Sequence, residues 1–197
     1  MKYSFSNFQG ISGTRLELQR LSEDHVIPLT DALFSHETFF VSHRGYNTKE
    51  IVREKIHERF VEQEKDKSLT MVAVDMQTGK LCGMSSLLLP SANFTKVEIG
   101  FTWLTDDSKR TFVNTEMKYL MLKYAFETMQ VNRVEFSIAP ENAASVRAII
   151  RTGATFEGTL RKWRYNSASD KGDRSIFSII DDEWQTVCSA LKSKLRM

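Results

Sequence analysis

Cysteine is scarce in this chain of 197 residues, which has only Cys82 and Cys188. The two lie far apart, and neither belongs to a Cys-x-x-Cys pair, so we expect free thiols in a reducing compartment. The four histidines show no metal-ligand spacing such as His-Glu-x-x-His. We therefore expect no metal.

Long apolar runs are also missing. No stretch of about 18 apolar residues exists that could span a bilayer. The N-terminus shows no charged segment followed by an apolar run, as a signal peptide would. These absences predict a cytoplasmic protein with no membrane partner.

Neither charge predominates: 27 Lys and Arg face 25 Asp and Glu, for a net charge of +2. Proteins that bind nucleic acid usually carry a concentrated basic stripe, so we expect no nucleic-acid partner. The chain has only three prolines and no Pro/Gly-rich linker, while 41% of its residues are hydrophobic. This composition can bury a core and favours one domain over residues 1–197.

Hydrophobic periodicity predicts strands alternating with helices. The predicted strands are Thr14–Arg20, Ser68–Asp75, Lys80–Leu89, Lys96–Leu104, Arg133–Ile138, Ala154–Tyr165 and Arg174–Ile180. Helices are predicted over Glu23–His36, from an Asn47 cap to Lys65, and over Thr111–Met129, Asn142–Arg151 and Asp181–Lys194. This order predicts an α/β or α+β layered fold with a mixed sheet.

One junction carries candidate chemistry: the apolar strand Val97–Leu104 leads through a loop into the long helix. A helix N-terminus offers unpaired N–H groups and partial positive charge, which suit phosphate. Lys109 and Arg110 add two cations before the helix, and Asn114 and Thr115 lie in its first turn. A surface basic pair before an ordinary helix explains the spacing equally well, because no Gly-x-Gly-x-x-Gly or Walker signature is present.

Several short motifs around this junction occur in a characteristic order. They are Glu98–Leu104, Val113–Lys118, Leu120–Glu127, Arg133–Phe136, Asn142-x-x-Ser145, Gly153–Gly158 and Asp181–Trp184. Together they resemble the GNAT superfamily of N-acetyltransferases, in its RimJ/RimL-like branch. The resemblance runs from about Leu16 to the C-terminus and is densest from Val97 to Trp184.

The resemblance implies the GNAT α/β fold, a central mixed sheet of about seven strands with helices on both faces. Its central strands splay apart, with acetyl-CoA in the gap as cosubstrate. The pantetheine arm would pair with Phe101, Thr102, Trp103 and Leu104. The pyrophosphate would lie on the loop formed by Lys109, Arg110, Thr111, Phe112, Val113, Asn114 and Thr115. Asn142 and Ser145 match family positions near the pantetheine and across the cofactor cleft.

The chain departs from the family pattern at three positions. Arg110 and Phe112 stand where the family's loop commonly has glycine, which tolerates positive φ and lets phosphate approach. Arg110 could compensate through its guanidinium, and Phe112 could extend into the site. Ile149 replaces a Tyr that protonates the leaving thiolate in many GNAT enzymes, so the general acid is unassigned.

The implied reaction is direct attack of a primary amine on the thioester carbonyl in a ternary complex. The acceptor could be a protein N-terminus or a small-molecule amine. Glu98 is the candidate base, with burial raising its pKa, although an ion-paired structural glutamate fits equally well. Backbone N–H groups near Trp103 and Leu104 could stabilise the oxyanion.

The acceptor would enter beside an aromatic segment that includes Phe39, Phe40, His43 and Tyr46. These residues could form a substrate wall or plug the core. An alternative function is a GNAT-fold protein that binds CoA for regulation and has little or no activity. A homodimer is compatible with either function.

Overall fold

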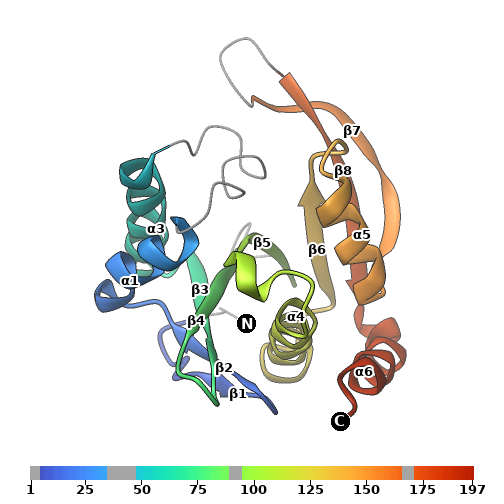
Figure 1. Cartoon of the computed structure of the whole chain (residues 1–197). Helices are drawn as coiled ribbons and strands as arrows, with labels where there is room; N and C mark the ends of the chain where they lie inside the picture. The colour runs from blue at the N-terminus through green and yellow to red at the C-terminus, as the bar shows by residue number, and fades with distance from the viewer. Residues whose placement is uncertain (1–4, 35–47, 89–94, 166–170) are drawn as a thin grey trace.

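The computed structural model describes residues 5–34, 48–88, 95–165 and 171–197 (Figure 1). The strands are β1 (Ile11–Ser12), β2 (Leu16–Arg20), β3 (Ser68–Asp75), β4 (Leu81–Leu88), β5 (Lys96–Leu104), β6 (Arg133–Ile138), β7 (Thr155–Tyr165) and β8 (Lys171–Ile180). The helices are α1 (Glu23–Phe34), α3 (Lys49–Glu64), α4 (Val113–Lys123), α5 (Ala143–Thr152) and α6 (Asp181–Leu195). A 3₁₀ turn, η1 (Asp106–Ser108), precedes α4, and a π-helical turn, η2 (Tyr124–Thr128), extends it.

The strands form a single sheet in the order β1-β2-β3-β4-β5-β6-β8-β7. Only β5 and β6 are parallel, and each other neighbouring pair is antiparallel. The predicted mixed sheet with helices on both faces is confirmed. The strand beyond those predicted is β1, which has 2 residues and is too short to show an alternating pattern.

Two hydrophobic clusters pack against the sheet, one on each face. Helices α1 and α3 form the smaller cluster with side chains of β3, β4 and β5, including Val72, Met84 and Trp103. Helices α4, α5 and α6 form the larger cluster on the other face, with Val97 and Ile99 of β5 among its members. On β5, the side chains of Val97 and Ile99 therefore face α4, α5 and α6, whereas that of Trp103 faces α1 and α3.

The cap of α3 differs from the prediction. Thr48, not Asn47, is the N-cap residue, and its hydroxyl accepts a hydrogen bond from the Ile51 N–H at 3.3 Å. Both Asn and Thr are favourable N-cap residues, so the sequence alone does not decide between these two adjacent positions. Asn47 itself lies outside the described residues.

Within the described residues, no helix is long and apolar enough to cross a membrane.

Strands β5 and β6 are paired only where they begin. Their register is Lys96 with Arg133, Val97 with Val134, and Glu98 with Glu135. Beyond Glu98 they part, whereas β6 stays paired with β8 along its length. Figure 1 shows the two strands diverging.

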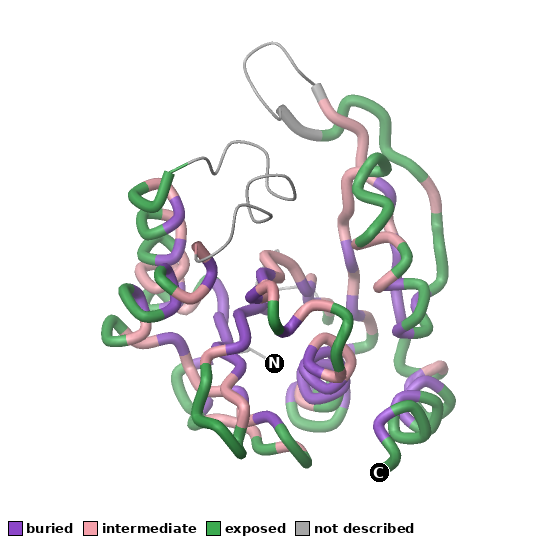
Figure 2. The backbone as a smooth tube through the Cα atoms, viewed as in Figure 1, coloured by how far each residue is buried: buried purple, intermediate pink, exposed green. Residues whose placement is uncertain are grey.

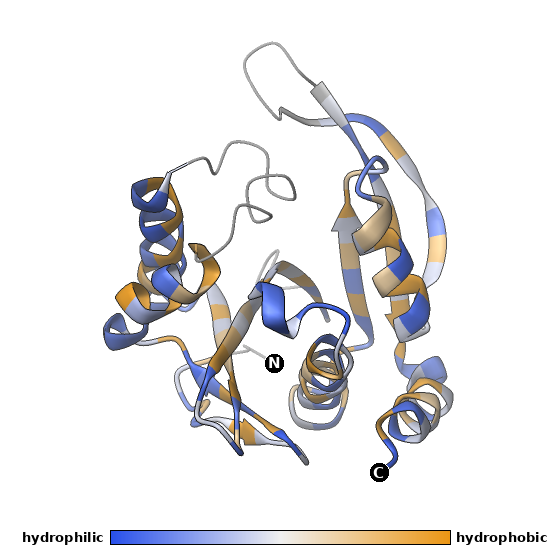
Figure 3. Cartoon of the chain, viewed as in Figure 1, coloured by the Kyte–Doolittle hydropathy of each residue, from blue (hydrophilic) through white to orange (hydrophobic). Residues whose placement is uncertain are grey.

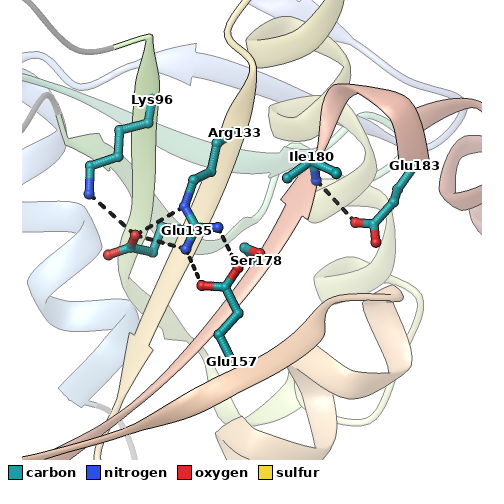
Figure 4. Close-up of polar contacts among 7 residues, drawn as sticks. All are labelled: Lys96, Arg133, Glu135, Glu157, Ser178, Ile180 and Glu183. Atoms are coloured by element: carbon teal, nitrogen blue, oxygen red, sulfur yellow. Dashed lines mark hydrogen bonds and ion pairs between the residues drawn. The ribbon is translucent and has the colours of Figure 1, made fainter.

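A charged network holds the strands together at the closed end of this gap (Figure 4). Glu135 accepts from Lys96 at 3.3 Å and from Arg133 at 3.1 Å. Arg133 also binds Glu157 of β7, which accepts from the Ser178 hydroxyl at 2.7 Å. The Arg133 hydrogen bond lowers the pKa of Glu157 to about 2, so the network stays charged over the physiological range.

Candidate active site

The open end of the gap leaves one side of β5 without a strand partner among the described strands. Beyond Glu98, residues 99–104 pair with β4 on one side but have no register with β6 on the other. Extended backbone with an uncovered edge can pair with another extended chain. The site therefore offers a strand-shaped ligand a row of backbone hydrogen-bonding groups.

A β-bulge shapes this edge. Met84 is opposite Trp103 and Ser86 is opposite Gly100, so β5 has one residue more than β4 between these pairs. Phe101 lies in the bulge with φ of 49°, a left-handed conformation that is uncommon for non-glycine residues. Its ring lies 4.2 Å from the guanidinium carbon of Arg59 on α3. This contact holds the bulge against the α3 face of the sheet.

Glu98 is the last residue of β5 that pairs with β6. Its side chain lies on the face opposite Val97 and Ile99, which belong to the larger hydrophobic cluster. A Cβ added at Gly100 would lie 3.5 Å from its Oε1, so the carboxylate is directed along the strand toward the bulge. Glu135 across from it is neutralised by Lys96 and Arg133. The carboxylate of Glu98 is therefore placed on the α3 face where the gap opens.

The net positive charge of the loop after β5 is lower than the sequence suggested. Lys109 forms an ion pair with Asp106 of η1, so its charge is compensated. Arg110 is exposed and has no ion pair among the described residues. Its φ of 60° is left-handed, which explains why glycine suits this position. Figure 3 shows the hydrophilic η1 turn between the apolar parts of β5 and α4.

The first turn of α4 is partly capped from within the loop. The Thr111 hydroxyl accepts from the Val113 N–H at 3.3 Å, and the Glu116 N–H donates to the Phe112 carbonyl. The N–H groups of Asn114 and Thr115 are among those that a helix leaves without an internal partner. These groups and Arg110 are suited to hold an anion.

The sequence allowed Phe112 to extend into the site, but in the structure its ring is held by two contacts. Its ring centre lies 3.7 Å from the guanidinium carbon of Arg15, and the ring packs against the larger hydrophobic cluster. Phe112 thus fixes the start of α4 against the N-terminal part of the sheet.

Glu116 anchors α4 more strongly. Its side chain has 0% exposure, and its Oε1 accepts from the backbone N–H groups of Thr14, Arg15 and Leu16 at 2.6, 2.8 and 3.3 Å. A Cβ at Gly13 would lie 2.4 Å from the same oxygen. The carboxylate therefore fixes the position of the α4 N-terminus relative to the start of β2.

Across the gap, Asn142 is the N-cap of α5, and its Oδ1 accepts from the Ser145 N–H at 3.1 Å. That oxygen serves the helix, while the amide NH₂ of Asn142 is available for other contacts. Ile149 is 6% exposed and belongs to the hydrophobic core. No proton donor is therefore present at this position.

Lys118 is a site residue that sequence reasoning missed. It lies on α4 with 2% exposure, beneath the β5 bulge. Figure 2 shows that α4 is buried over most of its length. The sequence does contain a sign that Lys118 is buried. The run Met117–Leu122 is apolar on nearly all sides of the helix, so a lysine within it has no side that faces solvent.

The predicted substrate wall, Phe39, Phe40, His43 and Tyr46, lies outside the described residues. A cavity of about 530 Å³ lies beside the β5–α4 loop, between that loop, Ala32 of α1 and the β3–β4 turn around Thr78. Its lining includes Thr111, Phe112 and Val113 of the predicted pyrophosphate loop, and no residue of β6 or α5 is part of it.

The sequence matches a known domain family. Residues 15–155 match the family described as the acetyltransferase (GNAT) domain. A curated Bacillus subtilis (strain 168) protein named "Putative ribosomal N-acetyltransferase YdaF" is 31% identical over 107 residues, which are 54% of this chain. The match spans 57% of the length of that relative.

Solved structures share the fold along nearly the whole chain. A GCN5-related N-acetyltransferase from Brucella melitensis aligns with a TM-score of 0.83 and 22% identity, over 98% of this chain and 88% of that one. Mycobacterium smegmatis RimJ in complex with CoA-disulfide aligns with a TM-score of 0.75 and 16% identity, over 92% and 90%. At these identities the likeness is one of fold.

Proposed function

The chain belongs to the GNAT acetyltransferase family, and from this premise we propose that it transfers the acetyl group of acetyl-CoA to a primary amine. The observation that carries the proposal is the parting of β5 from β6 after Glu98. It leaves an uncovered strand edge that leads toward the N-terminus of α4, the two features needed for an extended arm and a pyrophosphate.

The residues of the gap fit acetyl-CoA. Backbone groups of Phe101–Leu104 would pair with the pantetheine amides, since no described strand pairs with this edge. The N–H groups at the start of α4 and the Arg110 guanidinium would hold the pyrophosphate. The side chains of Trp103 and Val113 are buried in the core, so these two residues would contribute through their backbone only.

Glu98 would act as the base, directly or through water. The attacking amine must be neutral, and a lysine-type amine has a pKa of about 10.4 against about 7.7–8.0 for an α-amine. Glu98 lies on the α3 face at the mouth of the gap, so an amine arriving from that side meets the carboxylate before the thioester. Backbone N–H groups of the bulge would stabilise the oxyanion.

The names of the relatives, which include a ribosomal N-acetyltransferase, favour a protein as the acceptor, and within that class we propose a protein N-terminus. A small-molecule amine is the alternative acceptor. The second candidate function, CoA binding without catalysis, is favoured by Ile149, which is buried where many relatives have a proton-donating Tyr.

Coenzyme A is expected to stabilise the folded protein against heat. A ligand that binds only the folded state at about 100 times its Kd adds about 2.7 kcal/mol. For a domain of this size we expect a rise in Tm of several degrees, at about 2–4 °C per kcal/mol. The measurement is a thermal melt with CoA, with pantetheine alone as the control that lacks the pyrophosphate.

Thiol release from acetyl-CoA with a panel of N-terminal peptides and small amines then separates the two functions. Release with any amine supports the transferase. A Tm shift without release supports the regulatory function, and the absence of both a Tm shift and calorimetric binding at millimolar CoA would refute the cosubstrate assignment.

Replacement of Arg110 is expected to weaken CoA binding by about 1.5–3 kcal/mol, the range for a hydrogen bond to a charged group. Arg110→Ala and Arg110→Gly both remove the guanidinium, but only Gly relieves the left-handed backbone. We expect equal losses of affinity by calorimetry, with the Gly variant about 1 kcal/mol more stable than the Ala variant. Lys123→Ala, which removes a charge from the exposed far end of α4, is the control. Unchanged affinity in both Arg110 variants would contradict the contact.

A further inference from the structure

Three polar side chains form a buried network beneath the β5 bulge. The Lys118 amine donates to the Thr102 hydroxyl at 2.6 Å and to the Ser85 hydroxyl at 3.0 Å. The two hydroxyl oxygens lie 2.8 Å apart, and Ser85 also donates to the Gly100 carbonyl at 3.3 Å. The network thus joins α4, β4 and the bulged part of β5.

Thr102 is the member of this network that reaches solvent. Lys118 is 2% exposed and Ser85 is 0% exposed, whereas Thr102 is partly exposed. Thr102 lies on the stretch of β5 that has no partner on the β6 side. A proton on the Lys118 amine can therefore reach a ligand in the gap through the Thr102 hydroxyl.

Within the described part of the chain, no carboxylate forms an ion pair with Lys118. The groups that face its amine from β4 and β5 are hydroxyls. On its own helix, Glu116 is directed toward Arg15 and the β2 backbone, and Tyr119 stacks on Trp184 of α6. Desolvation accordingly lowers the pKa of Lys118 to about 7. Such an amine can give up a proton at physiological pH and take one back.

The two faces of β5 separate this network from Glu98. Thr102 is directed to Lys118 on the α4 face, whereas Glu98 lies on the α3 face, opposite Val97 and Ile99. A thioester held along the β5 edge would thus have a base on one side and a proton donor on the other. This is the arrangement required when an amine approaches from one side and a thiol leaves toward the other.

We propose that Thr102 is the catalytic acid of the acetyl transfer and that Lys118 supplies its proton. The inference rests on the proposed function. The Thr102 hydroxyl would contact the departing sulfur, and Lys118 acts through Thr102 as a positioning and proton-supplying residue. The pair would take the place of the Tyr that Ile149 replaces.

The proton balance is as follows. The amine nitrogen forms the new bond to the carbonyl carbon, and its surplus proton passes to Glu98 or to water. When the carbon–sulfur bond breaks, its electron pair stays on sulfur, which takes the hydroxyl proton of Thr102. Thr102 is restored by a proton from the Lys118 ammonium. The resulting neutral amine regains a proton from solvent after the products leave.

The test compares Thr102→Val, which removes the hydroxyl at nearly constant shape, with Thr102→Ser, which keeps it. We expect the Val variant to lose about 10²-fold in kcat, the lower range for general acid catalysis, and the Ser variant to lose only a few-fold. KM for acetyl-CoA should change little in either. Equal kcat in the Val and Ser variants would overturn the role of Thr102.

Lys118→Met tests the proton supply through pH profiles. In the wild-type protein kcat should fall as the pH rises above about 7, because Lys118 loses its proton. The Met variant should have a kcat about 10²-fold lower without this descending limb. An unchanged limb in Lys118→Met would overturn the role of Lys118.

A readout without turnover separates this proposal from the proposed function. Ultraviolet thiolate absorbance of bound CoA, followed against pH, reports the pKa of the CoA thiol. In wild-type protein the Thr102 hydroxyl, positioned by Lys118, should donate a hydrogen bond to the thiolate, so Thr102→Val and Lys118→Met should each raise the thiol pKa. If CoA binds and acetyl transfer occurs but neither variant changes these readouts, the relay is refuted while the transferase stands. If CoA does not bind at all, the proposed function itself fails.

Discussion

Glu98→Gln is expected to lower kcat/KM by about 10²–10⁴-fold, the usual value of general-base assistance, while CoA affinity barely changes. The substitution keeps the shape of the side chain and removes the proton acceptor. The structure supports a local effect, because Glu98 lies at the point where β5 leaves β6 and its carboxylate is directed toward the bulge. Steady-state kinetics with the best amine of the panel provide the measurement.

The matched control is Glu135→Gln. Glu135 is the cross-strand partner of Glu98, but its carboxylate is occupied by Lys96 and Arg133. This control should reduce stability more than catalysis. Relative to the wild-type protein, Glu98→Gln should recover part of its rate at higher pH, where more amine is neutral. Full activity with an unchanged pH profile would make Glu98 structural, and catalysis would then rest on proximity and polarisation of the thioester.

Glu116→Ala should destabilise the protein by about 3–5 kcal/mol, the cost of breaking a buried charged interaction on one side. The variant leaves the N–H groups of Thr14, Arg15 and Leu16 without the oxygen that they share, and it opens a space beneath β2. Glu116→Gln keeps one carbonyl acceptor and should cost less. Urea unfolding, with Lys123→Ala as the helix control, measures the difference.

A double-mutant cycle with Gly13 sharpens this prediction. Gly13→Ala alone places a methyl group against the Glu116 carboxylate, since an added Cβ would lie 2.4 Å from Oε1. In the Glu116→Ala background this clash is gone, so the second substitution should cost much less than it does alone. Strictly additive free energies of unfolding would show that the carboxylate is not positioned as described.

The helices and strands were predictable because the spacing of their apolar residues reflects which side chains are buried. Alternation in Lys96–Leu104 identified β5, whose buried and less buried residues alternate over Lys96–Gly100. The helical spacing that predicted a helix from Thr111 also located α4, which begins at Val113. These features depend on local periodicity, which a single sequence contains.

The site depended on contacts that no local pattern reveals. The bulge at Phe101 arises from the register between β4 and β5, and the ion pair between Lys109 and Asp106 depends on the fold of η1. Glu116 was expected only as part of a family motif, because its partners lie about 100 residues earlier in the chain. Lys118 was missed for the same reason: its hydroxyl partners belong to β4 and β5.

The divergence of β5 and β6 also affects how the protein would behave before its ligand arrives. Most sheets confine uncovered backbone to their outer strands, where charge or proline discourages aggregation. Here, among the described strands, an uncovered edge lies inside the sheet, and its sequence Ile99–Leu104 is uncharged and mostly apolar. A nascent or ligand-free chain would therefore expose a template for misassembly at its centre. Coenzyme A bound along β5 as proposed would cover this strand edge and so hinder misassembly. The yield of soluble protein should therefore depend on the cellular supply of coenzyme A.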